Sequence, residues 1–391
     1  MAIRLRSQSS QLPTLYQRLG LPLLIMIALL PLPALGQVKP HAALEHLQDA
    51  CPPPRNTPAS NPSKNPDPIS VQYKTENFVT RQPIERQVIA DLYLPARLQP
   101  KTPVLVMSPG WGSHYKEYDA LARSFTAHQF VVVIVNHPGS NEAQKQAVCH
   151  GKATALVDAN EFIYRSVDVK QVLNQLETLN RKHYRGRLNL KQVGIYGYSL
   201  GGITALTLAG AQFDFAQLHR DCLSQKPSSN LSLTVLCLAR KLPQQDYRLK
   251  DKRIKAVFLV NPVSASIFGS EGLKTIKAPV FWMAGDSDLV TPLASEHLPS
   301  FEALGTESKY LAIAQGAAHI DWNIGPESLQ TYLKTFGLAF FQMYVANHSE
   351  YGTQLTSSYA QQMSSSAFPL KLSTVLLNQD DSQTAALKHL K

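Results

Sequence analysis

"KQVGIYGYSLGGIT", residues 191–204, joins a strand pattern to a helical pattern around a single serine. The apolar run "QVGIY" reads as a strand, and "SLGGITALTLAG" reads as the start of a helix, with G-x-S-x-G between them. A five-residue match recurs by chance, so the alternative is an ordinary Gly-Ser loop. The strand and helix on either side favour a nucleophile elbow, which lifts a hydroxyl above the sheet at a helix N-terminus. We predict that Ser199 is a nucleophile.

Around this stretch, apolar strand patterns alternate with amphipathic helical ones. The strand patterns are 102–110, 130–140, 254–262, 278–286 and 309–319, and the helical ones are 118–129, 159–180 and 329–346. Continuous Val/Ile/Leu runs between helices are typical of a parallel sheet that is covered on both faces. The pattern therefore predicts an α/β fold, with a mostly parallel central sheet, helices on both faces and the chemistry at the carboxyl ends of the strands.

The same patterns divide the chain into segments. Arg4, Arg6 and Arg18 precede a short apolar run that ends in small residues near Gly36, which is typical of a secretory signal peptide. The alternative is a retained membrane anchor. The predicted segments are a signal peptide over 1–36, a Pro-rich arm over 37–69, the α/β domain over 70–346 with a cap-like insertion at 211–252, and a loosely attached polar tail over 347–391.

The four cysteines fit a protein exported to the periplasm or secreted. No C-x-x-C occurs, so the sequence does not indicate a redox or metal motif. Cys222 with Cys237 would close a short loop, and that pairing would leave Cys51 with Cys149. The second pair follows only by exclusion.

Charge and composition narrow the partners. The chain of 391 residues has 44% hydrophobic residues and a formal net charge of +10. Without residues 1–36, Lys and Arg number 35 against 28 Asp and Glu. Since no dense basic cluster with interleaved aromatics is present, nucleic acid is a poor partner, while weak peripheral contact with an anionic membrane remains open. We expect no cofactor and no metal, and the sequence leaves the oligomeric state open.

A serine nucleophile needs a base and an acid that orients the base. His319 follows a later strand pattern in "LAIAQGAAHIDW" and is the predicted base. Asp288, in the pattern G-x-x-D-x-x-x-P from Gly285 to Pro292, is the predicted acid. Asp286 and Asp321 are the alternative acids, and His137 is expected to shape a loop.

The tetrahedral intermediate needs two hydrogen-bond donors for its oxyanion. The backbone N–H of Leu200, directly after the serine, is the first expected donor. The backbone N–H of Trp111, in the loop "SPGWGSH", is the second, and a core Trp on a plain turn is the alternative. We also predict that Trp111, His114 and Tyr198 contact the substrate.

With these motifs in place, the chain resembles an α/β-hydrolase of the dienelactone hydrolase and platelet-activating-factor acetylhydrolase-like group. The resemblance rests on "SPGWGSHYKEY", "FVVVIVNHPGSN", "GYSLGG", "GDSDLVTP" and "GAAHID", between residues 102 and 322. It implies hydrolysis of short-acyl or lipid-like carboxylic esters through an acyl-enzyme. Strict dienelactone hydrolases use cysteine, so Ser199 places the chain on the esterase and acetylhydrolase side.

Three other functions stay open. The "SPG-aromatic" loop is similar to that of cutinase-like polyester hydrolases, which need an open, shallow groove. A peptidase would share the same triad order. A binding protein with an inherited fold is the alternative from a different class, and an intact Ser199, Asp288 and His319 disfavours it.

Overall fold

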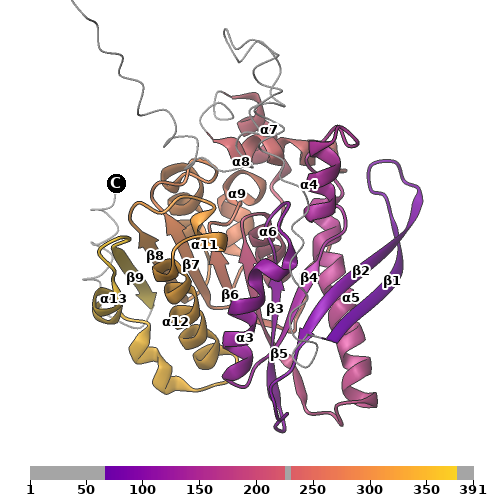
Figure 1. Cartoon of the computed structure of the whole chain (residues 1–391). Coiled ribbons are helices and arrows are strands. Elements are labelled where there is room, and N and C mark those ends of the chain that lie inside the picture. Colours follow the sequence, from indigo (N-terminus) through magenta and orange to yellow (C-terminus); the bar gives the residue numbers. More distant parts are fainter. Residues whose placement is uncertain (1–66, 225–229, 377–391) are drawn as a thin grey trace, which may run out of the picture.

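A single nine-stranded sheet organises the part of the chain that the computed structural model describes, residues 67–224 and 230–376 (Figure 1). The strands lie in the order β1-β2-β4-β3-β5-β6-β7-β8-β9. Their bounds are β1 (Asp67–Glu76), β2 (Pro83–Tyr93), β3 (Thr102–Ser108), β4 (Val131–Asn136), β5 (Leu188–Tyr198), β6 (Ile254–Val260), β7 (Val280–Gly285), β8 (Ser308–Ala314) and β9 (Leu370–Leu376). The strands from β4 to β8 pair in parallel, and β1, β2 and β9 pair antiparallel at the edges.

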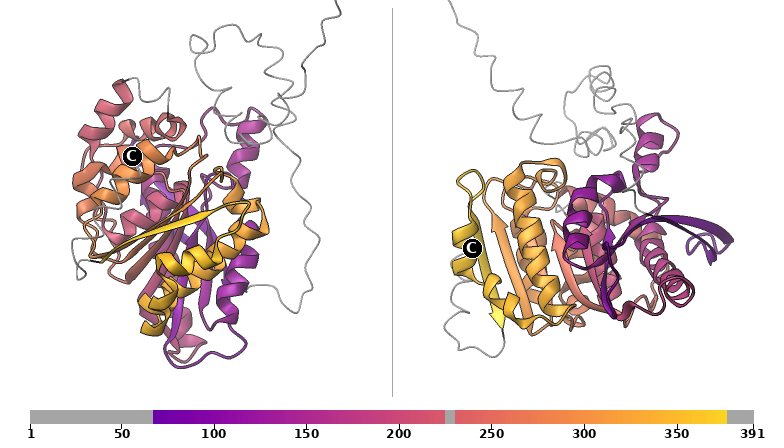
Figure 2. Two further views of the ribbon diagram at one scale, coloured as in Figure 1. Left: turned by 90° about the vertical axis from the view of Figure 1, so that its left-hand side faces the viewer. Right: turned by 60° about the horizontal axis from the view of Figure 1, so that its bottom comes forward.

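Helices cover both faces because the central strands are apolar on both sides. In β3, Val104 and Val106 join one core cluster, whereas Leu105 and Met107 join the other. The first cluster packs on α5 (Glu161–Lys182), α6 (Leu200–Ala209) and α9 (Ala265–Lys274), and the second on α3 (Asp119–Ala127) and α12 (Glu327–Tyr344). Figure 2 shows the twisted sheet between these two helical layers. The predicted mostly parallel sheet with helices on both faces is confirmed.

The segment after residue 346 differs from the prediction. Instead of a loosely attached tail, residues 349–376 form a 3₁₀ turn, the helix α13 (Ser357–Met363) and β9, which pairs with β8 from Leu370 to Leu376. An edge strand needs only alternate apolar side chains, and Leu370 and Leu372 are buried in the core. The polar composition of the segment hides this strand. Residues 377–391 lie outside the described residues.

Most of the predicted N-terminal segments lie outside the residues that the structure describes. The signal peptide over 1–36 and most of the arm over 37–69 fall outside the described residues, and β1 already begins at Asp67. Across residues 67–224 and 230–376, none of the helices has both the length and the apolar character that crossing a membrane requires.

The segment over 211–252 contains two short helices, α7 (Phe215–Leu223) and α8 (Leu231–Leu236), which lie above α6 and α9 in Figure 1. Cys222 at the end of α7 is disulfide-bonded to Cys237, directly after α8, with 5.7 Å between their Cα atoms. Cys149 is also disulfide-bonded. Its predicted partner, Cys51, lies outside the described residues.

Candidate active site

Ser199 occupies the sharp turn between β5 and α6. Its φ of 52° and ψ of −118° are rare for a residue with a side chain, and such a conformation costs about 1–3 kcal/mol. Three backbone hydrogen bonds hold it. The Ser199 N–H donates to the Val260 carbonyl at 3.0 Å, and the Ser199 carbonyl accepts from the N–H groups of Gly202 at 2.8 Å and Val263 at 3.1 Å. The turn thus presents the hydroxyl at the N-terminus of α6, where the helix dipole favours negative charge.

The glycines of "GYSLGG" are needed for close approach rather than for an unusual φ. A Cβ on Gly197 would lie 2.4 Å from the Gly201 carbonyl oxygen, and a Cβ on Gly201 would lie 1.9 Å from the Ser108 carbonyl oxygen. The strained φ belongs to the serine itself. As a result, the N-terminal turn of α6 packs directly on the backbone that follows β3.

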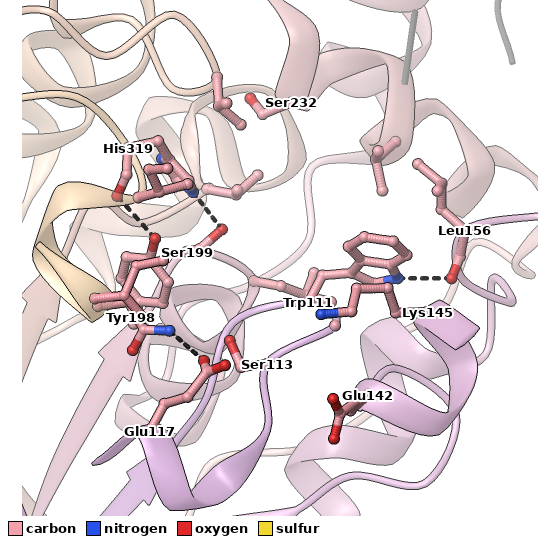
Figure 3. Close-up of a pocket in the computed structure, with 18 of the residues that line it drawn as sticks. Trp111, Ser113, Glu117, Glu142, Lys145, Leu156, Tyr198, Ser199, Ser232 and His319 are labelled. Atoms are coloured by element: carbon pink, nitrogen blue, oxygen red, sulfur yellow. Dashed lines mark hydrogen bonds between the residues drawn. The ribbon is translucent and has the colours of Figure 1, made fainter. Parts of the chain in front are cut away.

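Ser199, His319 and Asp288 come together from the ends of β5, β8 and β7. The Ser199 Oγ lies 2.9 Å from the His319 Nε2 (Figure 3). The His319 Nδ1 lies 2.6 Å from the Asp288 Oδ2. With Asp288 ionised, Nδ1–H donates to the carboxylate and Nε2 accepts from the serine hydroxyl. Ser199 and His319 are 8% and 6% exposed, so a small ligand can still reach them, while Asp288 is 2% exposed.

Asp288 is fixed as the carboxylate that orients His319. Its Oδ1 accepts from the backbone N–H groups of Val290 at 2.7 Å and Thr291 at 2.8 Å, and its Oδ2 accepts from the Thr291 hydroxyl at 2.7 Å. Burial alone would raise the pKa of Asp288. The interaction with His319, which includes the hydrogen bond from Nδ1, outweighs burial and holds this pKa below its ordinary value.

Asp286 and Asp321, the alternative acids, accept hydrogen bonds from backbone N–H groups in loops. The Asp286 Oδ1 accepts from the Gly316 N–H at 2.7 Å, and the Asp321 Oδ2 accepts from the Ala318 N–H at 2.8 Å. His114, predicted to contact the substrate, is not among the pocket-lining residues. Its Nδ1 instead accepts from the Lys116 N–H at 3.1 Å and caps the 3₁₀ turn Tyr115–Tyr118. His137 is buried away from Ser199 in a network of its own.

The two expected oxyanion donors lie on the adjoining backbone segments. In the described part of the chain, the N–H groups of Trp111 and Leu200 have no hydrogen-bond acceptor. The Trp111 indole is held separately, because its Nε1–H donates to the Leu156 carbonyl at 2.7 Å (Figure 3). Trp111 and Leu200 both line the cavity that contains Ser199.

A cavity of about 320 Å³ opens onto Ser199 and His319. Its walls are mostly apolar, with Glu117, Glu142 and Lys145 at one side (Figure 3). The apolar lining residues are Trp111, Leu156, Leu200, Val235, Leu236, Val263, Val290, Ile320 and Ile324. Tyr198 also lines the cavity, and its hydroxyl donates to the His319 carbonyl at 2.8 Å. Its contact with the substrate stays a prediction.

Several residues that line the cavity cannot be identified from the sequence. Val235 and Leu236 come from α8, and Leu156 comes from a loop between α4 (Glu142–Cys149) and α5. They carry no motif, and only the fold brings them to Ser199. Thr291 has a partial signal: an aspartate side chain commonly accepts from the backbone N–H two residues on, as Asp288 does from Val290, and this turn brings Thr291 next to the carboxylate. Among residues 67–224 and 230–376, no group of three or more His, Cys, Asp and Glu side chains is placed to hold a metal ion.

Comparison with known proteins agrees with this geometry. Residues 103–214 match a family model described as the alpha/beta hydrolase fold. The match runs from β3 through α6, so it includes Ser199 but not Asp288 or His319. The search of curated proteins finds no match. Together, the sheet order and the matched segment define an α/β-hydrolase domain and support a hydrolase.

Two buried histidines near the site make the free energy of unfolding depend on pH. Burial lowers the pKa of His137 to about 3 and that of His297 to about 4. In the unfolded chain both imidazoles take up a proton near pH 6.5, whereas in the folded protein they stay neutral to much lower pH. The stability that the two neutral histidines contribute is therefore complete above about pH 6.5 and is lost as the pH falls toward their folded-state pKa values. We expect each histidine to lower the free energy of unfolding by about 2 kcal/mol between about pH 7 and pH 5.

Urea unfolding at a series of pH values measures this slope. His137→Gln removes one titrating group, so its free energy of unfolding should fall less steeply with acid than that of the wild type, whatever its value at neutral pH. An unchanged slope would contradict the assignment of His137 as a buried neutral imidazole.

Proposed function

We propose that this protein is a serine esterase that hydrolyses carboxylic esters through an acyl-enzyme on Ser199. The observation that carries the proposal is the unbroken hydrogen-bonded line from Asp288 through His319 to Ser199. It ends beside two backbone N–H groups that have no acceptor in the described chain.

In the proposed reaction, the Ser199 Oγ attacks the ester carbonyl while His319 Nε2 takes the hydroxyl proton. The carbonyl electrons move to the oxygen, which accepts hydrogen bonds from the N–H groups of Trp111 and Leu200. The intermediate collapses, the bond to the alcohol breaks, and His319 returns the proton to the departing oxygen. Water then repeats the sequence on the acyl-enzyme and releases the acid. Asp288 stays ionised and stabilises the imidazolium.

The size and lining of the cavity favour an apolar acyl group of limited length. Its volume of about 320 Å³ lies at the small end of ordinary ligand sites. Apolar side chains from the loop after β3 and from α8 surround it. These features favour the short-acyl or lipid-like substrates of the acetylhydrolase-like group. A cutinase-like polyester hydrolase is less well supported, because α8 narrows the space above Ser199.

Export is part of the proposal. The Cys222–Cys237 disulfide fits an oxidising compartment such as the periplasm or the extracellular space. The signal-like N-terminal pattern, which lies outside the described residues, points the same way.

Filling the cavity tests the substrate class. Val235 on α8 packs against Leu156, as Trp111 does, and lines the cavity, so Val235→Trp should shorten the acyl pocket. We expect kcat/KM for p-nitrophenyl octanoate to fall by about tenfold or more, because lost methylene contacts are worth 10–200-fold. Turnover of the acetate should stay within about threefold, because its acyl group is too short to reach Val235.

Leu223→Trp is the matched control, since Leu223 lies in the same segment and is 67% exposed. Equal losses for acetate and octanoate, or none in Val235→Trp, would contradict the assignment of this cavity as the acyl pocket. Release of soluble monomers from a polyester film by the wild type would instead favour the cutinase-like function.

A further inference from the structure

A second Ser–His–Asp line lies beneath the loop that follows β3. The Ser108 Oγ is 3.0 Å from the His137 Nε2, and the His137 Nδ1 is 2.8 Å from the Asp168 Oδ2. The three side chains are 0–2% exposed. The line resembles the catalytic one in its atoms, but no ligand can reach its serine, so it does not serve as a second nucleophile.

Its hydrogen bonds have one consistent direction. Asp168 is ionised: although burial raises its pKa, Arg86 and His137 hold the pKa at about 2. Nδ1–H of His137 therefore donates to Asp168, and Nε2 accepts from the Ser108 hydroxyl. The Ser108 Oγ in turn accepts from the Arg165 Nη2 at 3.1 Å. The chain of bonds therefore begins at Arg165.

Arg165, on α5, reaches both backbone segments that carry the oxyanion donors. On one side its Nη2 also donates to the Pro109 carbonyl, two residues before Trp111. On the other side its Nε donates to the Thr204 Oγ1 at 3.1 Å. Thr204 lies one turn after Leu200 on α6.

A third bond extends this contact. The Arg165 Nη1 donates to the Ser140 Oγ at 2.5 Å, and the Ser140 carbonyl accepts from the Gly112 N–H at 2.8 Å. Trp111 is thus held through its neighbours on both sides. Arg165 has a hydrogen-bond acceptor for each of its three nitrogens, and it is fully buried with its own charge.

The buried charges around Arg165 are balanced. Arg86 donates to both Glu161 and Asp168, with distances of 2.7–2.9 Å. Two guanidinium groups therefore face two carboxylates, with the neutral imidazole of His137 between them. Burying a balanced, fully hydrogen-bonded cluster costs far less free energy than burying a lone cation. The planar guanidinium of Arg165 can therefore stay buried beneath the site in one fixed orientation.

We propose that Arg165 is a positioning residue that holds the N–H groups of Trp111 and Leu200 at the spacing an oxyanion requires. This inference rests on the proposed function. Oxyanion donors act through fixed geometry, so a shift of either segment would weaken the hydrogen bonds made in the transition state and leave the apolar acyl pocket intact. Loosening Arg165 should therefore lower kcat more than it raises KM.

The test removes one acceptor at a time. Thr204→Val deletes the link to α6, and Ser140→Ala deletes one of the two links to the Trp111 loop while the bond to the Pro109 carbonyl remains. For p-nitrophenyl acetate we expect each to lower kcat about tenfold, less than the 10²–10³-fold for losing a donor outright, with KM within about threefold. The rate of Ser199 phosphonylation by a fluorophosphonate should fall in parallel. Thr204→Ser, which keeps the hydroxyl, should restore both.

Tyr73→Phe is the matched control. The Tyr73 hydroxyl donates to Asp168 Oδ1 at 2.6 Å at the far end of the network, so its loss should lower Tm but leave kcat within about twofold. If Thr204→Val and Ser140→Ala lower Tm and leave kcat and phosphonylation unchanged, the role is structural and the inference is overturned. A wild type with no turnover or labelling at Ser199 would instead contradict the proposed function, and this inference with it.

Discussion

Ser199→Ala is expected to lower kcat for p-nitrophenyl acetate by about 10⁴–10⁶-fold, the range measured when a triad serine is removed from other hydrolases. The physical reason is that no other hydroxyl in the cavity lies within hydrogen-bond distance of the His319 Nε2, which the Ser199 Oγ approaches to 2.9 Å. The cavity and the N–H groups of Trp111 and Leu200 remain, so KM should change little. Initial rates with the purified variant measure the effect.

Ser358→Ala is the control, since Ser358 is an exposed residue of α13 away from the cavity. It should match the wild type in rate and in Tm. Equal rates for Ser199→Ala and the wild type would contradict the assignment of the nucleophile.

Asp288→Asn should lower kcat by about 10⁴-fold, because the hydrogen bonds at this position dictate how the amide must sit. The backbone N–H groups of Val290 and Thr291 both donate to Oδ1, so the amide oxygen has to occupy that site. The NH₂ group then takes the place of Oδ2 and faces the His319 Nδ1. Two donors cannot face each other, so the proton moves to Nε2, which can no longer accept the serine proton.

Rates measured across the pH range, together with Tm, test this prediction. Asp286→Asn is the matched control: Asp286 precedes the same loop, and an amide oxygen can still accept from the Gly316 N–H. Its rate should stay within about threefold of the wild type. A larger loss in Asp286→Asn than in Asp288→Asn would contradict the choice of acid.

Much of the fold can be predicted from local sequence patterns. The apolar runs of β3 to β8 are legible because both faces of these strands are buried, and the turn at Ser199 combines a strand, a helix and close-packed glycines. The placement of Asp288 and His319 on the same edge of the sheet as Ser199 is predictable, because each follows a parallel strand and the carboxyl ends of parallel strands share one edge. In each case neighbouring residues carry the signal.

What the sequence does not reveal depends on contacts between distant segments. β9 is a short edge strand at the end of a segment that is rich in Ser, Thr and Gln, so the composition of the whole segment resembles a polar tail. Arg165 lies in a helical pattern in which an arginine normally faces solvent, and only the fold places Ser108, Ser140 and Thr204 around it. His114 stands in the right loop, but the path of the backbone turns it to cap a 3₁₀ turn.

Covalent labelling tests the assignment of Ser199 as the nucleophile. The purified protein is treated with a fluorophosphonate, and the modified residue is identified by peptide mass mapping. The assignment of Ser199 as the nucleophile predicts one adduct per chain, on Ser199, with loss of esterase activity in step with labelling and no adduct on the buried Ser108. An adduct on another serine, or full esterase activity with no adduct on Ser199, would contradict it.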